Sequence, residues 1–258
     1  MSPGDVAGFD TEIRDRTSAP LDAETRHRIV DDLIAGMPTY GVADYFRTKA
    51  SLLDPQDVTV IARERAGGAC VGLAVGGWME CRSTRFLHVK TMLIGEAWHR
   101  GPVLRLIWRA LFTGLLRDGA AFPPAIVLKT YNPKSFSAMR AFAGVPDTAI
   151  FPAIGGETFP AALMSAVRDI AATLSPGRVF DERTGVIKGA ADGVTGFYPT
   201  LPLCGKAPID GHFQAYVTPD DRLLGCLFVR SPQAAERILR AFFVPRTRVK
   251  DDVTLASS

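Results

Sequence analysis

Apolar residues recur along the chain with two different periods, and each period predicts a different kind of element. Runs rich in β-branched and other apolar residues predict strands over residues 58–63, 70–78, 86–94 and 125–130. Apolar positions three and four residues apart predict helices. These helices are expected over 22–36, 42–53, 102–118, 132–144, 159–174 and 234–243. The mixture of strands and helices indicates an α/β (α+β) fold.

The first three predicted strands follow one another closely along the chain. The segment ERAGGA (64–69) joins the first two as a hairpin, because its paired glycines can supply positive φ. We therefore expect three consecutive antiparallel strands. Gly72, Gly76 and Gly77 remove side chains from the second strand, which favours a bulge, the close approach of a ligand, or simple strand twisting.

The C-terminal half is less regular. Residues 181–206 are rich in Gly and Pro with little periodicity, and such long segments are either functional lids or disordered. Phe197, Tyr198 and Leu201 favour a segment that packs on the core. A second hairpin is predicted further on, from strands at 212–217 and 223–230.

A strand, a tight turn and a helix follow one another around residue 100. The strand at 86–94 ends at Gly95, and Pro102 occupies the first helical position, where proline is tolerated. A helix that begins directly after such a turn directs its N–H groups and its positive end toward one place, which is typical of an anion site. Seven Lys and Arg against the single acid Glu96 lie between Arg82 and Arg117, although a solvated basic helix face explains this charge equally well.

Composition narrows the classes of function. The chain has 258 residues, 47% of them hydrophobic, which suffices for a real core. A net charge of +3 from 30 basic and 27 acidic residues gives no reason to expect nucleic acid as a partner. With no apolar window of membrane length and no leader pattern at the N-terminus, we expect a cytoplasmic protein that does not associate with membranes.

The four cysteines give no sign of a metal site or a disulfide framework. Cys70, Cys81, Cys204 and Cys226 are scattered, without CxxC spacing. Cys70 and Cys226 lie in apolar runs and are expected as small core residues. Cys204 lies in a Pro/Gly-rich segment without an identifiable partner base, so a nucleophilic role has little support.

The order of these elements, with the details HRGPV (99–103) and YNPKSF (131–136), resembles the core of the GNAT acyltransferase superfamily. Members of this family carry an acyl group on coenzyme A. The resemblance covers residues 58–144, and it implies a mixed, mostly antiparallel central sheet flanked by helices. Aligned on Gly101, the pyrophosphate loop of the family is degenerate here, because Trp98 stands where Gln or Arg belongs and Val103 where a small residue belongs.

The resemblance implies a set of cofactor-binding positions. The turn would hold the pyrophosphate of an acyl-CoA with its amides and the Arg100 side chain, a backbone amide of the strand would polarise the thioester carbonyl, and Asn132 would lie near the pantetheine arm. The family often has a tyrosine acid seven residues after this asparagine, where this chain has Met139. The expected cofactor-binding residues are Met92, Leu93, Ile94, Trp98, Arg100, Gly101, Val103, Leu104, Asn132 and Ser135.

Transfer to an amine also needs a base to deprotonate the ammonium. The candidates by position are Glu96 and His88, with His99 and Tyr131 as further possibilities and a water chain as the alternative. Each has a structural interpretation as well. Glu96 can pair with Arg100, His88 can be a hydrogen-bonded strand residue, and His99 can be an exposed turn residue.

The same reasoning divides the chain into regions. After a mobile N-terminal arm comes a GNAT-like core, interrupted by an inserted helical and irregular lobe and completed by a β-hairpin plus helix before a frayed tail. The inserted lobe is the expected selector of the acceptor or of a long acyl chain. The boundaries are 1–20 for the arm, 21–144 for the core, 145–207 for the lobe, 208–244 for the hairpin and helix, and 245–258 for the tail.

Three functions are compatible with the sequence. The first is an acyl-CoA-dependent N-acyltransferase that acts on a small amine or an amino-acid-like acceptor, without a metal. The second is a non-catalytic GNAT-fold protein that binds a ligand. The third resembles N-acyl amino acid or N-acyl-homoserine-lactone synthases, which can take the acyl group from an acyl carrier protein, and an acidic carrier would suit the basic surface. A homodimer is left open.

Overall fold

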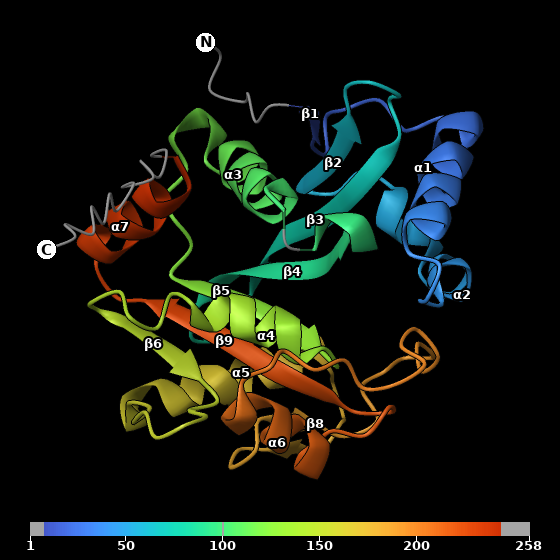
Figure 1. Ribbon diagram of the computed structural model, residues 1–258. Coiled ribbons are helices and arrows are strands. Elements are labelled where there is room, and N and C mark those ends of the chain that lie inside the picture. The colour runs from blue at the N-terminus through green and yellow to red at the C-terminus, as the bar shows by residue number, and fades with distance from the viewer. Residues whose placement is uncertain (1–7, 100, 244–258) are drawn as a thin grey trace, which may run out of the picture.

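The computed structural model describes residues 8–99 and 101–243, and within them one mixed sheet runs in the order β1-β2-β3-β4-β5-β9-β8-β7, with β6 paired to β9 (Figure 1). The strands are β1 (Phe9–Arg14), β2 (Val58–Glu64), β3 (Cys70–Glu80), β4 (Arg85–Ile94), β5 (Ala125–Thr130), β6 (Thr148–Phe151), β7 (Phe180–Asp181), β8 (Val186–Ile187) and β9 (Arg222–Val229). The mixed, mostly antiparallel sheet predicted from the sequence is confirmed.

Helices cover both faces of the sheet (Figure 1). They are α1 (Ala23–Gly36), α2 (Val42–Thr48), α3 (Val103–Leu115), α4 (Pro133–Arg140), α5 (Met164–Leu174), α6 (Ala207–Tyr216) and α7 (Pro232–Phe243), with 3-10 turns at Ala50–Leu53, Glu96–Trp98, Arg117–Gly119 and Ala161–Leu163. The described helices include none that combines the length and apolar character required to cross a membrane.

Hydrophobic core lies on both faces of the sheet, and each helix packs on one of them. Helices α3, α4, α6 and α7 contribute residues such as Leu106, Phe136 and Phe213 to one cluster, which also holds Leu87 and Leu128 from the strands. On the opposite face, α1 and α2 pack on the β2–β4 half of the sheet, and α5 packs on the β5–β9 half. The apolar stripes that predicted α1 to α5 and α7 therefore face the sheet.

Strands β2, β3 and β4 form the expected antiparallel meander, with positive φ at Gly68 in the first turn. The glycines of β3 serve packing. A Cβ on Gly72 would come within 2.7 Å of Ile107 Cδ1 in α3, so this glycine lets the helix approach the sheet. At Gly76 the register against β4 shifts, which places the extra residue Lys90 of β4 in a bulge.

The N-terminal arm is a correction to the sequence analysis. Residues Phe9–Arg14 form β1, which pairs antiparallel with β2 from Phe9↔Glu64 to Arg14↔Thr59. Backbone pairing along an edge strand fixes a segment whose polar composition alone suggested mobility. The expected tail from residue 245 and the first seven residues lie outside the described part of the chain.

The second predicted hairpin is also wrong in its first strand. Residues 212–217 belong largely to α6, whose buried Ile209 and Phe213 lie one turn apart and face the core. The second strand is β9, and its partners come from the 145–207 region instead. That region, expected as an inserted lobe, thus contributes β6, β7 and β8 to the same sheet as well as α5.

Strands β4 and β5 are parallel neighbours that separate soon after they meet. Their pairing consists of Leu87↔Ile126 and His88↔Val127. Beyond these pairs β4 continues for six further residues to Ile94 and β5 for three to Thr130, without a ladder between them. The two halves of the sheet therefore diverge toward the carboxyl ends of these strands.

Candidate active site

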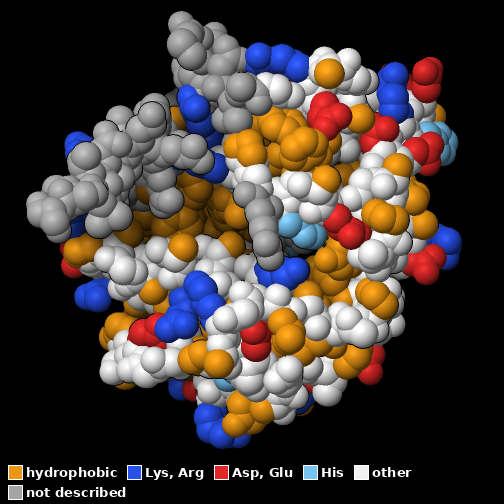
Figure 2. All heavy atoms as spheres, in the orientation of Figure 1, with side chains coloured by type: hydrophobic (Ala, Val, Ile, Leu, Met, Phe, Trp, Pro, Cys, Tyr) orange, Lys and Arg blue, Asp and Glu red, His pale blue; other side chains and the backbone are white. Residues whose placement is uncertain are grey.

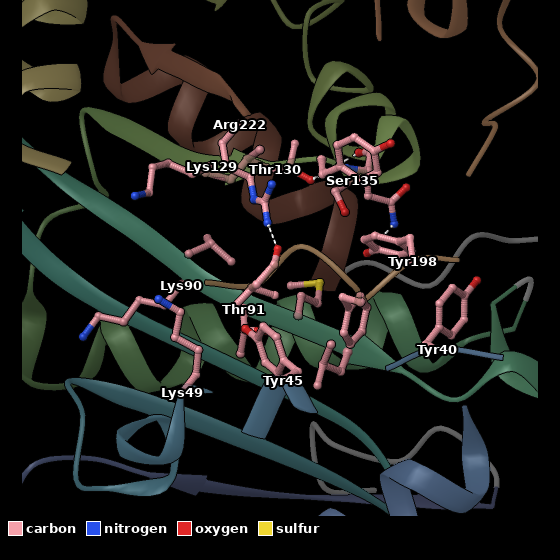
Figure 3. Close-up of a pocket in the computed structure, with 18 of the residues that line it drawn as sticks. Tyr40, Tyr45, Lys49, Lys90, Thr91, Lys129, Thr130, Ser135, Tyr198 and Arg222 are labelled. Atoms are coloured by element: carbon pink, nitrogen blue, oxygen red, sulfur yellow. Dashed lines mark hydrogen bonds between the residues drawn. The ribbon is translucent and has the colours of Figure 1, made fainter. Parts of the chain in front are cut away.

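A cavity of about 500 Å³ lies in the gap between the diverging ends of β4 and β5 (Figure 3). Its walls come from α2, α3, α4, the loop at 190–198 and the first residue of β9. Figure 2 shows the face of the molecule seen in Figure 1, which is hollowed in the region between α3 and α4 and has an apolar floor. The divergence of β4 and β5 thus opens the cavity that forms the candidate site.

The cavity reaches both faces of the sheet. On one face, here called the α3–α4 side, Leu104 and Trp108 of α3 lie opposite Ser135 and Ala138 of α4. On the other face, called the α2 side, it is lined by α2 and its following turn, by the 190–198 loop and by Arg222. Two ligands entering from opposite faces can therefore meet in the gap.

Many residues predicted for the site do come together around this cavity. They are His88, Met92, Leu93, Ile94, Leu104, Tyr131, Asn132 and Ser135. His99, considered as a further base, also lines it and has Nε2 at 2.9 Å from the Ile94 carbonyl oxygen. Arg100 lies outside the described residues, so its expected role stays a prediction.

The remaining predicted residues lie beside the cavity. Trp98 packs edge-on against Phe9 of β1, with ring centroids 4.9 Å apart. Val103, the first residue of α3, is fully buried. The Gly101 amide donates to the Trp98 carbonyl oxygen at 2.9 Å. Among the described residues before α3, one backbone hydrogen bond and the packing of Trp98 on β1 thus use groups that a ligand would otherwise contact.

Glu96 is held away from the gap. Its Oε1 accepts hydrogen bonds from the Thr39 hydroxyl at 2.7 Å and from the Thr39 amide at 3.0 Å. These hydrogen bonds lower the pKa of the Glu96 carboxyl below its ordinary value, which makes it a weaker base. Glu96 ties the turn before α3 to the α1–α2 connection.

Asn132 is fixed at the start of α4 by two hydrogen bonds of its side chain. Its Oδ1 accepts from the Lys134 amide at 2.9 Å, which makes it the N-cap of the helix. Its Nδ2 donates to the Tyr198 hydroxyl oxygen at 3.0 Å. The capping bond requires Oδ1 to face the Lys134 amide, so Nδ2 faces Tyr198. The Tyr198 oxygen therefore accepts this hydrogen bond, and its own proton can be donated to another acceptor.

Met139, at the position where the resembled family often has a tyrosine, belongs to the core. It is almost fully buried, and its methyl group would lie 3.1 Å from a Cβ placed on Gly225 of β9. The side chain therefore cannot donate a proton in the cavity. Tyr198, from the irregular segment, brings a hydroxyl group to this region from the other side of the gap.

The 190–198 loop is anchored to α2 by close packing. Gly41, directly before α2, donates its amide to the Phe197 carbonyl oxygen at 2.9 Å. A Cβ on Gly41 would lie 2.7 Å from the Gly196 carbonyl oxygen, so the close approach requires glycine. Tyr40 stacks on Phe197 at 5.7 Å and meets Tyr198 edge-on at 5.4 Å. The aromatic residues of an apparently irregular segment thus complete the wall of the cavity.

Tyr198 and Arg222 are site residues that the sequence did not assign. The aromatic pair in the 190–198 loop indicated packing, but nothing local indicated contact with Asn132, 66 residues away. Burial raises the pKa of the Tyr45 and Tyr198 hydroxyls above the ordinary tyrosine value, so both stay protonated at neutral pH. They can donate hydrogen bonds or protons to a ligand.

His88 lies in β4 where the two strands begin to separate. Burial, followed by the charges of Lys129 and Lys90, lowers its pKa to about 3. The imidazole is therefore neutral in the folded protein at neutral pH. A base this weak accepts a proton poorly, so His88 lines the cavity as a neutral polar group.

The buried His88 makes acid destabilise the fold. Below pH 6.5 the unfolded chain binds a proton at this histidine that the folded chain refuses down to about pH 3. His88 therefore does not reduce the free energy of unfolding above pH 6.5. Below that pH the free energy of unfolding falls by about 1.4 kcal/mol per pH unit. Denaturant unfolding at pH 7.5, 6.0 and 5.0 should show a steeper loss for the wild type than for His88→Gln. Equal slopes would contradict the buried, neutral histidine.

Cationic side chains predominate on the α2 side of the cavity. Lys49, Lys90, Lys129 and Arg222 all line it, whereas Asp192 is the only acidic residue among the described lining residues. Asp192 is itself engaged by Lys129 at 3.3 Å. Within the described residues no cluster of His, Cys, Asp and Glu is arranged to hold a metal ion.

The cysteines lie away from this chemistry. Cys70 and Cys226 are buried in the core, as expected. Cys204 donates its amide to Asp210 Oδ1 at 2.8 Å and does not line the cavity. Burial raises the pKa of its thiol, which reduces its nucleophilicity at neutral pH.

No protein-family model matches the chain, and no curated protein matches it in sequence. Solved structures that it resembles include diaminobutyrate acetyltransferase EctA from Paenibacillus lautus, in complex with L-2,4-diaminobutyric acid and CoA. That match has 18% identity over 60% of this chain and 88% of the other, with a TM-score of 0.32.

Two further matches are of the same kind. Aminoglycoside N-acetyltransferase AAC(6')-Iy in complex with CoA shares 12% identity over 54% of this chain and 89% of the other, with a TM-score of 0.36. The NatC complex bound to Gag peptide and CoA shares 15% identity over 54% and 83%, with a TM-score of 0.35. The elements on which the resemblance noted in the sequence depends, which are β4, the turn into α3, β5 and Asn132 at the start of α4, follow one another in the structure.

Proposed function

We propose that this protein is an acyl-CoA-dependent N-acyltransferase that transfers an acyl group from the thioester to the amine of a small metabolite by direct attack. The observation that carries the proposal is the cavity in the gap between β4 and β5, which is open to both faces of the sheet. A thioester arm entering from the α3–α4 side and an amine entering from the α2 side would meet there, as direct transfer requires.

The α3–α4 side would hold the acyl-CoA. The first amides of α3, at Val103 and Leu104, have no acceptor within the helix, and the positive end of the helix favours a pyrophosphate. Leu104, Trp108 and Ala138 offer apolar surface for the pantetheine arm. Since the Gly101 amide already donates to Trp98, the turn itself would contribute fewer donors than its glycine suggests.

The edge of β4 that faces β5 would polarise the thioester carbonyl. After His88 this edge has no strand partner, so backbone N–H groups between Met92 and Ile94 are candidates for contact with the carbonyl oxygen. The bulge at Lys90 turns the strand just before this stretch. Preorganised backbone donors of this kind stabilise the oxyanion of the tetrahedral intermediate.

Deprotonation of the amine would depend on the surroundings more than on one strong base. Glu96 is held by Thr39, and His88 has too low a pKa to accept a proton readily. Lysine and arginine side chains on the α2 side would lower the pKa of an incoming ammonium, because like charges disfavour its protonated form. Tyr131, which lines the cavity beside Tyr198, remains a candidate for relaying the proton to water.

Tyr198 would protonate the departing thiolate. Its hydroxyl stays protonated at neutral pH, and Asn132 donates to its oxygen without taking its proton. The balance of the step is simple. The amine nitrogen bonds to the acyl carbon, and the carbon–sulfur bond breaks. Tyr198 gives its proton to the sulfur, and the proton that the nitrogen loses reaches the tyrosine oxygen through solvent.

An acyl carrier protein as donor is the second candidate. The internal contacts of Trp98 and Gly101, just before α3, favour it. Trp98 packs on Phe9 and the Gly101 amide is used internally, so a nucleotide pyrophosphate would find few donors there. A carrier protein presents the same pantetheine arm without the nucleotide. A pantetheine thioester would then bind as well as the corresponding acyl-CoA.

Thermal unfolding with free CoA, acetyl-CoA, a long-chain acyl-CoA and acetyl-pantetheine tests these proposals. A ligand that binds only the folded state stabilises it by about 2.7 kcal/mol at a hundredfold excess over its Kd. We expect a clear shift with acetyl-CoA, and release of free thiol when an amine is added. Equal shifts with the pantetheine compound would favour the carrier protein. No shift with any of the four would refute both donors.

A further inference from the structure

Arg222 occupies an unusual electrostatic position in the cavity. It is the first residue of β9, and Figure 3 shows its side chain directed into the middle of the gap. The guanidinium donates to the carbonyl oxygens of Pro219 at 2.9 Å and Asp221 at 2.6 Å, and to that of Val194. Among residues 8–99 and 101–243, no carboxylate forms an ion pair with it.

A largely buried charge that forms no direct ion pair is costly for the folded protein, and the charge of Asp192, which pairs with Lys129, offsets only part of this cost at Arg222. Burial lowers the pKa of Arg222, which expresses the same cost. Backbone carbonyl dipoles satisfy three hydrogen bonds but carry no net charge. An anionic group in the cavity would therefore form a charge-assisted hydrogen bond with a cation that has no direct ion-pair partner.

The neighbouring lysines strengthen this preference unequally. Lys129 pairs with Asp192 and donates to Ser175 Oγ at 3.0 Å, and Lys90 donates to Gln56 Oε1 at 2.5 Å. Lys49, at the end of α2, has no side-chain partner among the described residues. Figure 3 shows the three lysines at one end of the cavity, with Arg222 between them and Tyr198. Lys49 is thus unpaired among the described residues, and Arg222 keeps its Nε–H and one Nη2–H for a ligand.

From this arrangement we infer that the acceptor is an amine that also carries an anionic oxygen group, a carboxylate or a phosphate, and that Arg222 and Lys49 bind this group on the α2 side. The inference rests on the proposed function, of which it specifies the acceptor. Binding the anion near Arg222 would leave the amine nearer the gap, where the thioester arrives. Polycationic amines would be repelled by the same side chains.

Binding without turnover is the first test. Thermal unfolding in succinate and in succinamide, at equal ionic strength and without CoA, compares a dicarboxylate with its neutral counterpart. We expect a larger shift with succinate in the wild type, and loss of the difference in Arg222→Gln, which keeps a polar side chain without the charge. Lys49→Gln should reduce it as well, while Lys206→Gln, at an exposed lysine away from the cavity, should not. Equal shifts with succinate and succinamide in the wild type would overturn the inference.

Turnover identifies the anion and separates this inference from the proposed function. Acetyl-CoA-dependent thiol release is measured with α-amino acids against their amides, with phosphoethanolamine against ethanolamine, and with spermidine. We expect kcat/KM to be about tenfold to hundredfold higher for one of the anionic partners, and the preference to fall in Arg222→Gln and Lys49→Gln. Acetyl-CoA binding with equal turnover of charged and neutral amines would refute the anionic acceptor alone. Absence of any acyl-CoA binding would refute the proposed function.

Discussion

Replacing Tyr198 with phenylalanine is expected to lower kcat about a hundredfold or more and to leave the Kd for acetyl-CoA nearly unchanged. A positioned general acid contributes about 10² to 10⁴ in rate, and the variant loses only the hydroxyl. The ring contacts with Tyr40 and Phe197 remain, because they do not involve the oxygen. Single-turnover kinetics and equilibrium binding of acetyl-CoA measure the two quantities separately.

Two companion variants make this prediction specific. Asn132→Ala removes the hydrogen bond to the Tyr198 oxygen and also the cap of α4, so a moderate fall in kcat with some loss of stability is expected. Tyr131→Phe tests the other tyrosine of the cavity, whose ring lies 6.1 Å from that of Tyr198 and which is the candidate relay for the amine proton, so a smaller fall in kcat is expected. If Tyr131→Phe were the slower enzyme, the roles assigned to the two tyrosines would have to be exchanged.

Filling the α3–α4 side should abolish acyl-CoA binding. Ala138 lines this part of the cavity from α4, opposite Leu104 and Trp108. An indole ring in place of its methyl group would occupy the space assigned to the pantetheine arm. We expect Ala138→Trp to raise the Kd for CoA about a hundredfold or more, because a blocked site forfeits the apolar contacts that the arm would make.

The same helix supplies a control for this substitution. Ala141, at the end of α4, is exposed and does not line the cavity, so Ala141→Trp should bind CoA as the wild type does. Calorimetric titration with CoA compares the two variants. Succinate should still stabilise Ala138→Trp, since the anion site lies on the α2 side. Unaltered CoA affinity in Ala138→Trp would place the cofactor elsewhere in the molecule.

The elements that sequence predicted best are those whose signal is local. Strands β2 to β4 and helices α1, α3 and α5 follow from runs and periods of apolar residues that face a core. The N-terminal strand β1 was missed because only Phe9 in it is buried, and backbone pairing rather than apolar alternation holds it. Residues 212–217 were misassigned because α6 buries few side chains, so its helical period is weak.

Part of the candidate site could not be predicted from the sequence, because its residues are brought together by contacts between distant segments. Met92, Ile94, Leu104 and Asn132 were predicted from the family resemblance of one continuous stretch, which holds a strand, a turn and two helix starts. Arg222 and the 190–198 loop arrive through the pairing of β9 with β8 and β5, which is decided by the whole sheet. The prediction of a basic region around residue 100 included Lys90 but missed Lys49 and Lys129, which also line the cavity.

The brief pairing of β4 and β5 has a mechanical consequence. The polypeptide passes only once between the β1–β4 half and the β5–β9 half of the sheet, through α3 and the exposed segment that follows it. Two residue pairs then join strands that would otherwise share a full ladder. A ligand bound in the gap would touch both halves and take the place of the missing rungs. Its binding would therefore also hold the two halves of the sheet together.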